Sequence, residues 1–165
     1  MALIELVIYT AIIGFLLLAM VSFILNAVQL RTKGKAAEEI AYNARVIQDR
    51  LQDAARHATA VQVASSVFDV DPGVLSFAMA AAQEDPTVFS LDADDGAFHV
   101  SIDGVGAALT TDRVSVENLV FTDVTGPNDA GLVRVNFTLM MENGVSPYFS
   151  YEESFQTTLR LSITP

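Results

Sequence analysis

The sequence predicts an α+β protein, in which one long N-terminal helix packs on an antiparallel β-sheet head. Three observations indicate this fold class. Residues 6–25 carry no charge, residues 31–60 repeat small and apolar side chains every three or four positions, and the later chain alternates at the period of a strand. We therefore expect an apolar helix over residues 1–30, an amphipathic neck helix over residues 31–60 and a β-sheet head over residues 61–165.

The uncharged run at residues 6–25 is twenty residues long. As an α-helix, a run of this length spans roughly 30 Å, which is the thickness of the hydrocarbon core of a bilayer. A signal peptide has a shorter apolar core and a basic segment before it, whereas no basic side chain precedes residue 6. The run is therefore expected to be a transmembrane helix, in which the backbone polar groups are bonded internally.

The neck helix is expected to continue from the apolar helix, because no proline occurs before Pro72. Its small and apolar side chains fall on one face and its charged side chains on the other, as in a helix with one packed face. The expected packed positions are Ala27, Leu30, Gly34, Ala37, Ile40, Ala41, Ala44, Ile47 or Gln48, Leu51, Ala55 and Ala58. A bend is expected at Gly34 or at Gly14, since glycine costs about 1 kcal/mol relative to alanine in a helix.

The head is expected to contain six strands separated by turns rich in Asp, Pro and Gly. The expected strands cover residues 74–77, 88–91, 98–102, 114–124, 132–141 and 149–163, and residues 78–83 are either a strand end or a short helical turn. The long strands place apolar residues on one face only, which is typical of an antiparallel sheet packed on a helix. These apolar residues are Val114, Val116, Leu119, Phe121, Val133, Val135, Phe137, Leu139, Met141, Phe155, Leu159, Leu161 and Ile163.

Composition excludes several classes of function. The chain has no cysteine, which excludes disulfides, thiolate catalysis and cysteine-ligated zinc or iron–sulfur sites. The net charge is −11, and residues 58–165 hold fifteen Asp or Glu against three Lys or Arg. An acidic head disfavours general electrostatic binding of nucleic acid. No nucleophile-elbow pattern occurs, so no catalytic residue is assigned and an enzyme is not expected, although a Ser-His-Asp set formed by the fold stays open.

Asp92, Asp94 and Asp95, which precede Gly96, resemble the start of a calcium-binding loop. The glutamate that such a loop needs downstream is replaced by Asp103, so a solvated hairpin turn is favoured. The same interpretation applies to the two aspartates before Pro72.

The two histidines, His57 and His99, have no matching set of ligands in the sequence, and neither a metal nor a cofactor is expected. Two further turns, at residues 126–131 and 143–147, are expected to be exposed loops available for filament contacts or adhesion.

Glu5 is the single charged residue among the first thirty. A carboxylate in a membrane-length apolar helix costs several kcal/mol unless it is paired or close to the surface. The nearest cation in the sequence is the α-amino group of Met1, which points out of the end of its own helix. A neighbouring helix displaced along the axis could bring its own amine to Glu5.

Residues 1–14, MALIELVIYTAIIG, resemble the mature N-terminus of type IV pilins and pseudopilins. The glutamate at the fifth position, the Leu-Ile-Glu-Leu sequence and the uncharged run carry the resemblance, which covers about the first 25 residues. The order of helix and then sheet agrees with that family. Met1 stands where phenylalanine is usual, Ala2 where threonine is common, and Ser22 where many pilus-forming members have a helix-breaking proline.

The resemblance implies that a prepilin peptidase removes a leader and that Met1 becomes the methylated N-terminal residue. The subunit would be stored in the cytoplasmic (inner) membrane, and the pilus assembly machinery would transfer it to an extracellular helical homo-oligomer. There, Glu5 would pair with the Met1 amine of a neighbouring subunit. The side chains expected to pack in the helical core of the filament are those of Leu3, Ile4, Leu6, Ile13, Gly14 and Leu17.

The favoured function is that of a structural pilin. A second possibility is a minor pilin or pseudopilin that primes or caps a fibre in type II secretion or DNA uptake. Residues 44–54, 116–121 and 155–161 resemble the neck helix and strands of minor pilins and J-type pseudopilins. A third is a single-span binding domain tethered to a membrane.

Overall fold

The structure is a computed structural model that describes residues 2–92, 94–126, 131–142 and 150–161. It confirms the α+β class, with one long N-terminal helix followed by antiparallel strands. The elements are α1 (Ala2–His57), β1 (Ala58–Val61), a 3-10 turn (Val63–Ser65), β2 (Leu75–Met79), β3 (Thr87–Leu91), β4 (Phe98–Ile102), β5 (Val105–Ala108), β6 (Val114–Asp123), β7 (Leu132–Glu142) and β8 (Ser150–Arg160). Two compact units divide the chain: the apolar unit, Met1–Ala37, and the head unit, Glu38–Pro165.

Helix α1 is 56 residues long and continues without a break through Gly14 and Gly34, the two positions at which the sequence predicts a bend. It ends at His57, three residues before the expected end of the neck helix, and the chain enters β1 directly. Arg56 and His57 lie in the last turn, where positive charge is favourable at the C-terminal end of a helix dipole.

Within the head unit, one face of α1 is buried against the strands. Its buried apolar side chains are those of Ile40, Ala44, Ile47, Leu51, Ala54 and Ala55. The predicted face is wrong at Ala41, which is exposed, and it omits Asn43, which is buried. The reason is that the buried stripe includes a polar position at residue 43, which a search for apolar periodicity does not find.

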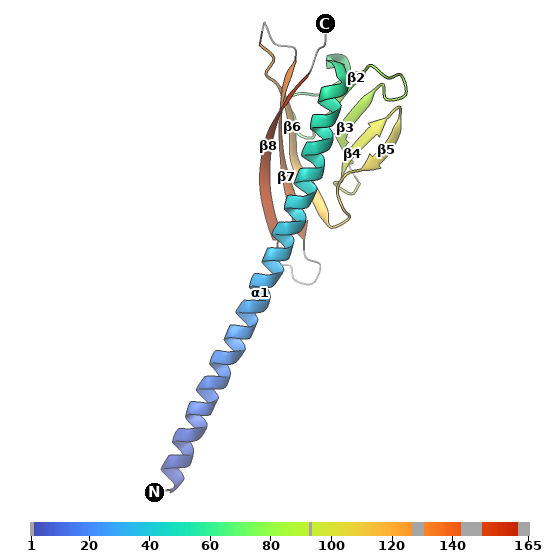
Figure 1. Ribbon diagram of the computed structural model, residues 1–165. Helices are drawn as coiled ribbons and strands as arrows, with labels where there is room; N and C mark the ends of the chain where they lie inside the picture. The colour runs from blue at the N-terminus through green and yellow to red at the C-terminus, as the bar shows by residue number, and fades with distance from the viewer. Residues whose placement is uncertain (1, 93, 127–130, 143–149, 162–165) are drawn as a thin grey trace. The chain divides into compact units, whose positions relative to one another are not determined.

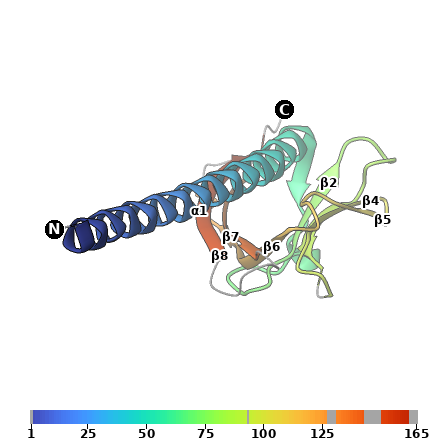
Figure 2. The same ribbon diagram turned by 90° about the horizontal axis from the view of Figure 1, so that it is seen from below.

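The head contains two antiparallel sheets where the sequence indicates one. Their strand orders are β1-β2-β3-β4-β5 and β6-β7-β8. Figures 1 and 2 show both sheets next to the C-terminal part of α1. Backbone hydrogen bonds join β6 to the first sheet's connecting segments: Gly73 N donates to Leu119 O, and Val116 N donates to Gly96 O, each at 2.8 Å. The two sheets therefore close over one common core.

The alternation predicted for the long strands is confirmed in the described residues. On β7, Val133, Val135, Phe137 and Leu139 are buried, as are Leu159 in β8 and Leu161 directly after it. Ile163 lies outside the described residues, as do residues 127–130 and 143–149 of the two predicted loops. On β6, a bulge at Asn118, whose φ is 52°, explains why the inward residues Val116 and Leu119 are three positions apart.

Strands β1 and β5 are not predicted by the sequence, and residues 78–83 prove to be the end of β2 followed by a turn. A row of aromatic rings then connects the two sheets across the core, from Phe77 and Phe89 through Phe98 to Phe137 and Phe155. Successive ring centroids are 5.6 to 6.5 Å apart, within the range of favourable aromatic contacts. This core holds the head together without a disulfide.

Candidate functional site

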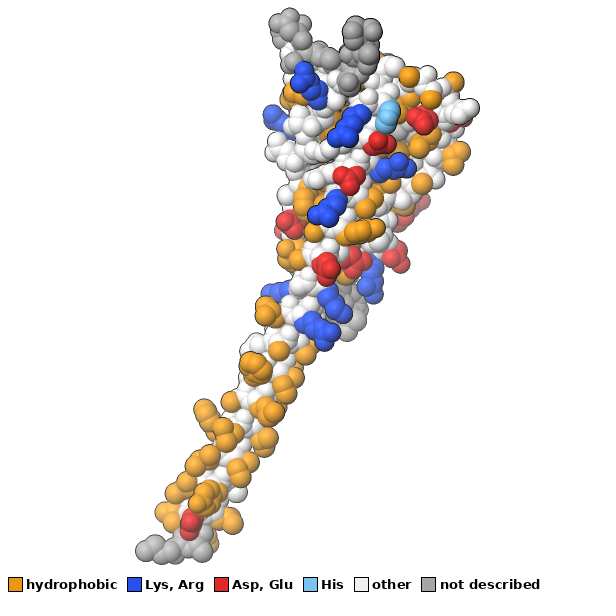
Figure 3. All heavy atoms as spheres, in the orientation of Figure 1, with side chains coloured by type: hydrophobic (Ala, Val, Ile, Leu, Met, Phe, Trp, Pro, Cys, Tyr) orange, Lys and Arg blue, Asp and Glu red, His pale blue; other side chains and the backbone are white. Residues whose placement is uncertain are grey.

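The candidate functional surface is the apolar part of α1, considered within its own unit. Every large hydrophobic side chain between Leu3 and Leu30 is between 50% and 80% exposed. This segment is long and apolar enough to span a membrane, with a mean hydropathy of 2.5 in a window that is 0% buried. Figure 3 shows these side chains along the helix, with one acidic side chain near its N-terminal end. Soluble monomers rarely leave so large an apolar surface uncovered.

The two threonine hydroxyls of α1 bond within the helix. The Thr10 hydroxyl lies 3.0 Å from both Leu6 O and Val7 O, so it donates its hydrogen bond to the backbone of its own helix. Thr32 Oγ1 likewise donates to Val28 O at 3.0 Å. A helix whose hydroxyls bond to their own backbone can lie in lipid without leaving those donors unpaired.

Glu5 lies in the first turn of α1, where the helix dipole favours a negative charge. Its side chain is exposed, and none of the ion pairs in the described part of the chain involves it. Met1, the residue predicted to be methylated and to pair with Glu5, lies outside the described residues. Glu5 is therefore one exposed carboxylate on a helix surface that carries no other charge up to Leu30.

The residues predicted to pack in a filament core do not all share one face. Leu3, Leu6, Ile13 and Leu17 are separated by three, seven and four positions, so they lie on one side of the helix. Ile4 lies on the opposite side of the helix. The surface around Gly14 is open, because a Cβ added there would have no neighbour within 4 Å. A helix that is apolar all round is typically buried, either in a membrane or among other helices.

A band of basic residues follows the apolar surface. Arg31, Lys33 and Lys35 are all exposed. Because successive residues rotate by about 100° around a helix, this band has Arg31 and Lys35 near one face and Lys33 away from them. Lysine and arginine at such a boundary can extend their charges toward the polar edge of a membrane.

In the head, the aspartates before Gly96 form the hairpin turn that the sequence favours over a calcium loop. Asp92 Oδ1 accepts from Asp94 N, and Asp95 Oδ1 accepts from Ala97 N, each at 2.9 Å. His99, for which the sequence offers no matching set of ligands, lies close to this turn, with its Nε2 3.9 Å from Asp92 Oδ2. The sequence signal that could have placed these residues together is the short turn between the strands expected at residues 88–91 and 98–102, because β3 and β4 pair across it.

His57, by contrast, lies on α1, and its hydrogen bond and ion pair within the described residues are both with Asp53 of the same helix. Its Nδ1 is 2.9 Å from Asp53 O and 3.6 Å from Asp53 Oδ1, and both side chains are mostly exposed. The structure therefore does not bring the two histidines into one site.

Asn43 is a buried polar residue that sequence reasoning missed. Its Nδ2 donates to Glu39 O at 2.8 Å, and its Oδ1 accepts from Thr111 N at 3.0 Å. The side chain thus ties α1 to the segment that follows β5. Its role is structural, because a buried amide side chain is satisfied here by backbone groups of its own helix and of Thr111, which is 68 residues away.

Comparisons with protein-family models, with curated proteins and with solved structures found no match to this chain. Its function is therefore inferred from its own residues and geometry.

Proposed function

We propose that this protein is a structural subunit of an extracellular type IV pilus-like filament, stored in the cytoplasmic membrane and polymerised through its apolar helix. The observation that carries the proposal is the apolar unit of α1. Its large hydrophobic side chains are exposed on all sides, and Glu5 is the one charge among its first thirty residues. The resemblance of residues 1–14 to mature pilins supports polymerisation as the function of this surface.

The apolar surface accounts for both states of the subunit. Burying one large aliphatic or aromatic side chain contributes about 1.5–3 kcal/mol relative to water. Side chains such as Leu3, Phe15 and Leu30, each more than 70% exposed, therefore need lipid or other protein around them. In the proposed cycle, the helix exchanges lipid contacts for contacts with identical helices, and water never covers it.

Pairing of Glu5 would fix the axial position of each helix relative to its neighbours, which apolar packing alone does not specify. A buried carboxylate without a partner is destabilising, whereas a paired one tolerates burial at a single geometry. We assign its partner as the α-amino group of Met1 on a neighbouring subunit, with methylation keeping that amine charged. A prepilin peptidase would expose the amine, and an assembly machine would extract the subunit. No catalytic role is proposed for the chain itself.

The test is the yield of sheared filaments from cells that carry Glu5→Gln, which keeps the shape of the side chain and removes its charge. We expect at least a tenfold lower yield, with an unchanged amount of subunit in the membrane. Glu38→Gln is the matched control, because Glu38 is an exposed glutamate on the same helix. Normal filaments from the Glu5 variant would contradict the proposed pairing.

Mass spectrometry of the purified subunit tests the other partner of the pair. A methylated α-amino group at Met1 supports the proposal. A formyl group on Met1, or a leader still attached before it, would contradict it.

A minor pilin or pseudopilin of a secretion or DNA-uptake fibre is the second candidate. It is favoured by Ser22, which replaces the helix-breaking proline of many pilus-forming members, and α1 is continuous there. The number of copies in sheared fibres separates the two candidates, because a major subunit dominates the fibre and a minor one is scarce. A protein found only in membranes, with no fibre, would instead be a tethered binding domain.

A further inference from the structure

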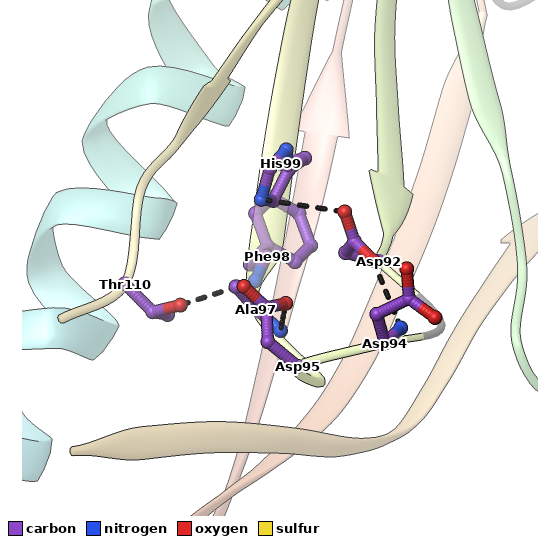
Figure 4. A network of polar contacts seen from close by, with 7 residues as sticks. All are labelled: Asp92, Asp94, Asp95, Ala97, Phe98, His99 and Thr110. Carbon is purple, nitrogen blue, oxygen red and sulfur yellow. Dashed lines mark hydrogen bonds and ion pairs between the residues drawn. The ribbon is translucent and has the colours of Figure 1, made fainter. Parts of the chain in front are cut away.

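Asp92, Asp95 and His99 converge on one point beside the turn between β3 and β4 (Figure 4). One carboxylate oxygen from each aspartate and one imidazole nitrogen from His99 all lie within 4.8 Å of one another. Asp94 belongs to the same turn, but its carboxylate is not part of this group. The group therefore consists of two oxygen donors and one nitrogen donor.

The fold holds these three side chains in place. Strand pairing puts Leu91 opposite Phe98 and Ser90 opposite His99, and Gly96, with a φ of 66°, allows the tight turn between the strands. Gly96 N donates to Asp92 O at 3.1 Å, which closes the turn. The two strands and their turn thus fix the positions from which the three side chains converge.

The carboxylates are oriented as well as positioned. In each aspartate, Oδ1 accepts a backbone N–H of the turn at 2.9 Å. The remaining oxygen of Asp92, Oδ2, is the atom that lies 3.9 Å from His99 Nε2. This distance is too long for a hydrogen bond, but it suits two ligands of one ion.

His99 gives an observation that is independent of the aspartates. Its Nε2 atom is buried and has no hydrogen-bond partner in the described part of the chain, although the side chain as a whole is 27% exposed. An unpaired buried polar atom is destabilising and rare in folded proteins. An ion bound between Nε2 and the two carboxylates would supply the missing partner.

We propose that Asp92, Asp95 and His99 bind a divalent transition-metal ion, of which Zn²⁺ is the representative probe. Imidazole nitrogen favours Zn²⁺ and similar ions, whereas Ca²⁺ and Mg²⁺ favour oxygen donors alone. Zinc binds nitrogen and carboxylate oxygen at about 2.0–2.2 Å, so its ligand atoms lie roughly 3–4 Å apart. Small side-chain movements close the spacing seen here to that range. Water completes the coordination, because Asp95 is exposed.

A bound ion would cross-link the turn to β4 and neutralise part of the charge of the acidic head. Because the three ligands converge only in the folded head, binding stabilises the folded state. This site is independent of the apolar helix, so the metal and filament proposals succeed or fail separately.

The experiment is a calorimetric titration of the full-length chain in detergent micelles with Zn²⁺ alone, together with the thermal midpoint of the head with and without the ion. We expect one saturable site per chain and a higher midpoint with Zn²⁺. His99→Ala and Asp95→Asn should each weaken binding by more than the 10- to 100-fold that is typical of losing an outer-sphere partner.

Two variants serve as matched controls and should bind Zn²⁺ like the unmodified chain. His57→Ala removes the chain's other histidine, which also has an aspartate nearby, and Asp94→Asn removes a carboxylate from the same turn. A His99→Gln variant with an unchanged midpoint in the absence of metal separates loss of a ligand from loss of folding. The proposal is overturned by unchanged Zn²⁺ binding in His99→Ala, by equal losses in the controls, or by no saturable binding to the unmodified chain. It is also overturned if Ca²⁺ binds more tightly than Zn²⁺ and does so without His99.

Discussion

In the apolar unit, the large hydrophobic side chains between Leu3 and Leu30 are at least 50% exposed, whereas in the head unit Ile47, Leu51 and Phe137 are at most 1% exposed. The same helix, α1, supplies both kinds of surface. The head buries its apolar residues under its own two sheets, and the first part of α1 has no such cover within its own unit. The head unit therefore covers its core with its own strands, whereas the apolar unit leaves a large hydrophobic surface exposed and is apolar enough to span a membrane.

Charge separates the two units in the same way. Residues 6–25 contain no charged side chain, while residues 58–165 contain fifteen Asp or Glu. On the long strands of the head, polar side chains occupy the face away from the core, as on β8 at Ser154, Gln156 and Thr158. The head is thus suited to water and the apolar helix to a water-free environment.

The largest effect should come from a charge placed in the head's core. Leu51 is fully buried on α1, so Leu51→Asp should destabilise the head by roughly 4 kcal/mol or more through a buried unpaired charge. Thermal unfolding followed by circular dichroism measures the loss, and resistance of the subunit to alkaline extraction from membranes should not change. Gln52→Asp, at the exposed neighbouring position, is the control. An unaltered thermal midpoint for Leu51→Asp would show that this face of α1 is not packed as described.

The reverse experiment places the charge in the apolar unit. Ile13→Asp should cost about 2.5–3.5 kcal/mol for insertion into a bilayer, which is the penalty for aspartate near the centre of a membrane helix. We expect a reduced share of the subunit in the membrane fraction, while the thermal midpoint of the head stays the same. Ile13→Leu, which keeps an apolar side chain, is the control. If the head lost stability as well, the two units would not be independent.

The smallest effects on stability should come from alanine substitutions at two glycines, one in the head unit and one in the apolar unit. A Cβ at Gly73 would lie 2.8 Å from Phe121 Cδ2 and 3.2 Å from Leu119 O, whereas a Cβ at Gly34 would meet nothing within 4 Å. Gly73→Ala should therefore destabilise the head by about 1–3 kcal/mol through overpacking. Gly34→Ala should leave the head unchanged and favour the helix by up to about 1 kcal/mol. Urea denaturation of both variants tests this, and a neutral Gly73→Ala would show that β6 can move aside.

The sequence alone determined α1 and the three long strands. These features depend on local patterns, because periodic side chains and the lack of proline act within one element. The uncharged run specified a helix, and the alternation on β7 specified its buried face before any partner strand was known. The bulge on β6 was not predicted, although the three-residue step from Val116 to Leu119 agrees with it. Glu5 stood out as one charge within a long apolar pattern.

Only the tertiary structure decided which distant segments meet. Strand β5 has no alternation and all four of its residues are exposed, so it is defined by its pairing with β4. Asn43 is buried because Thr111, 68 residues away, donates to it, and His99 gains its aspartate neighbours through the β3–β4 turn. The division of the strands into two sheets has the same origin. Such a contact depends on two distant segments together, so the residue pattern of one segment alone does not predict it.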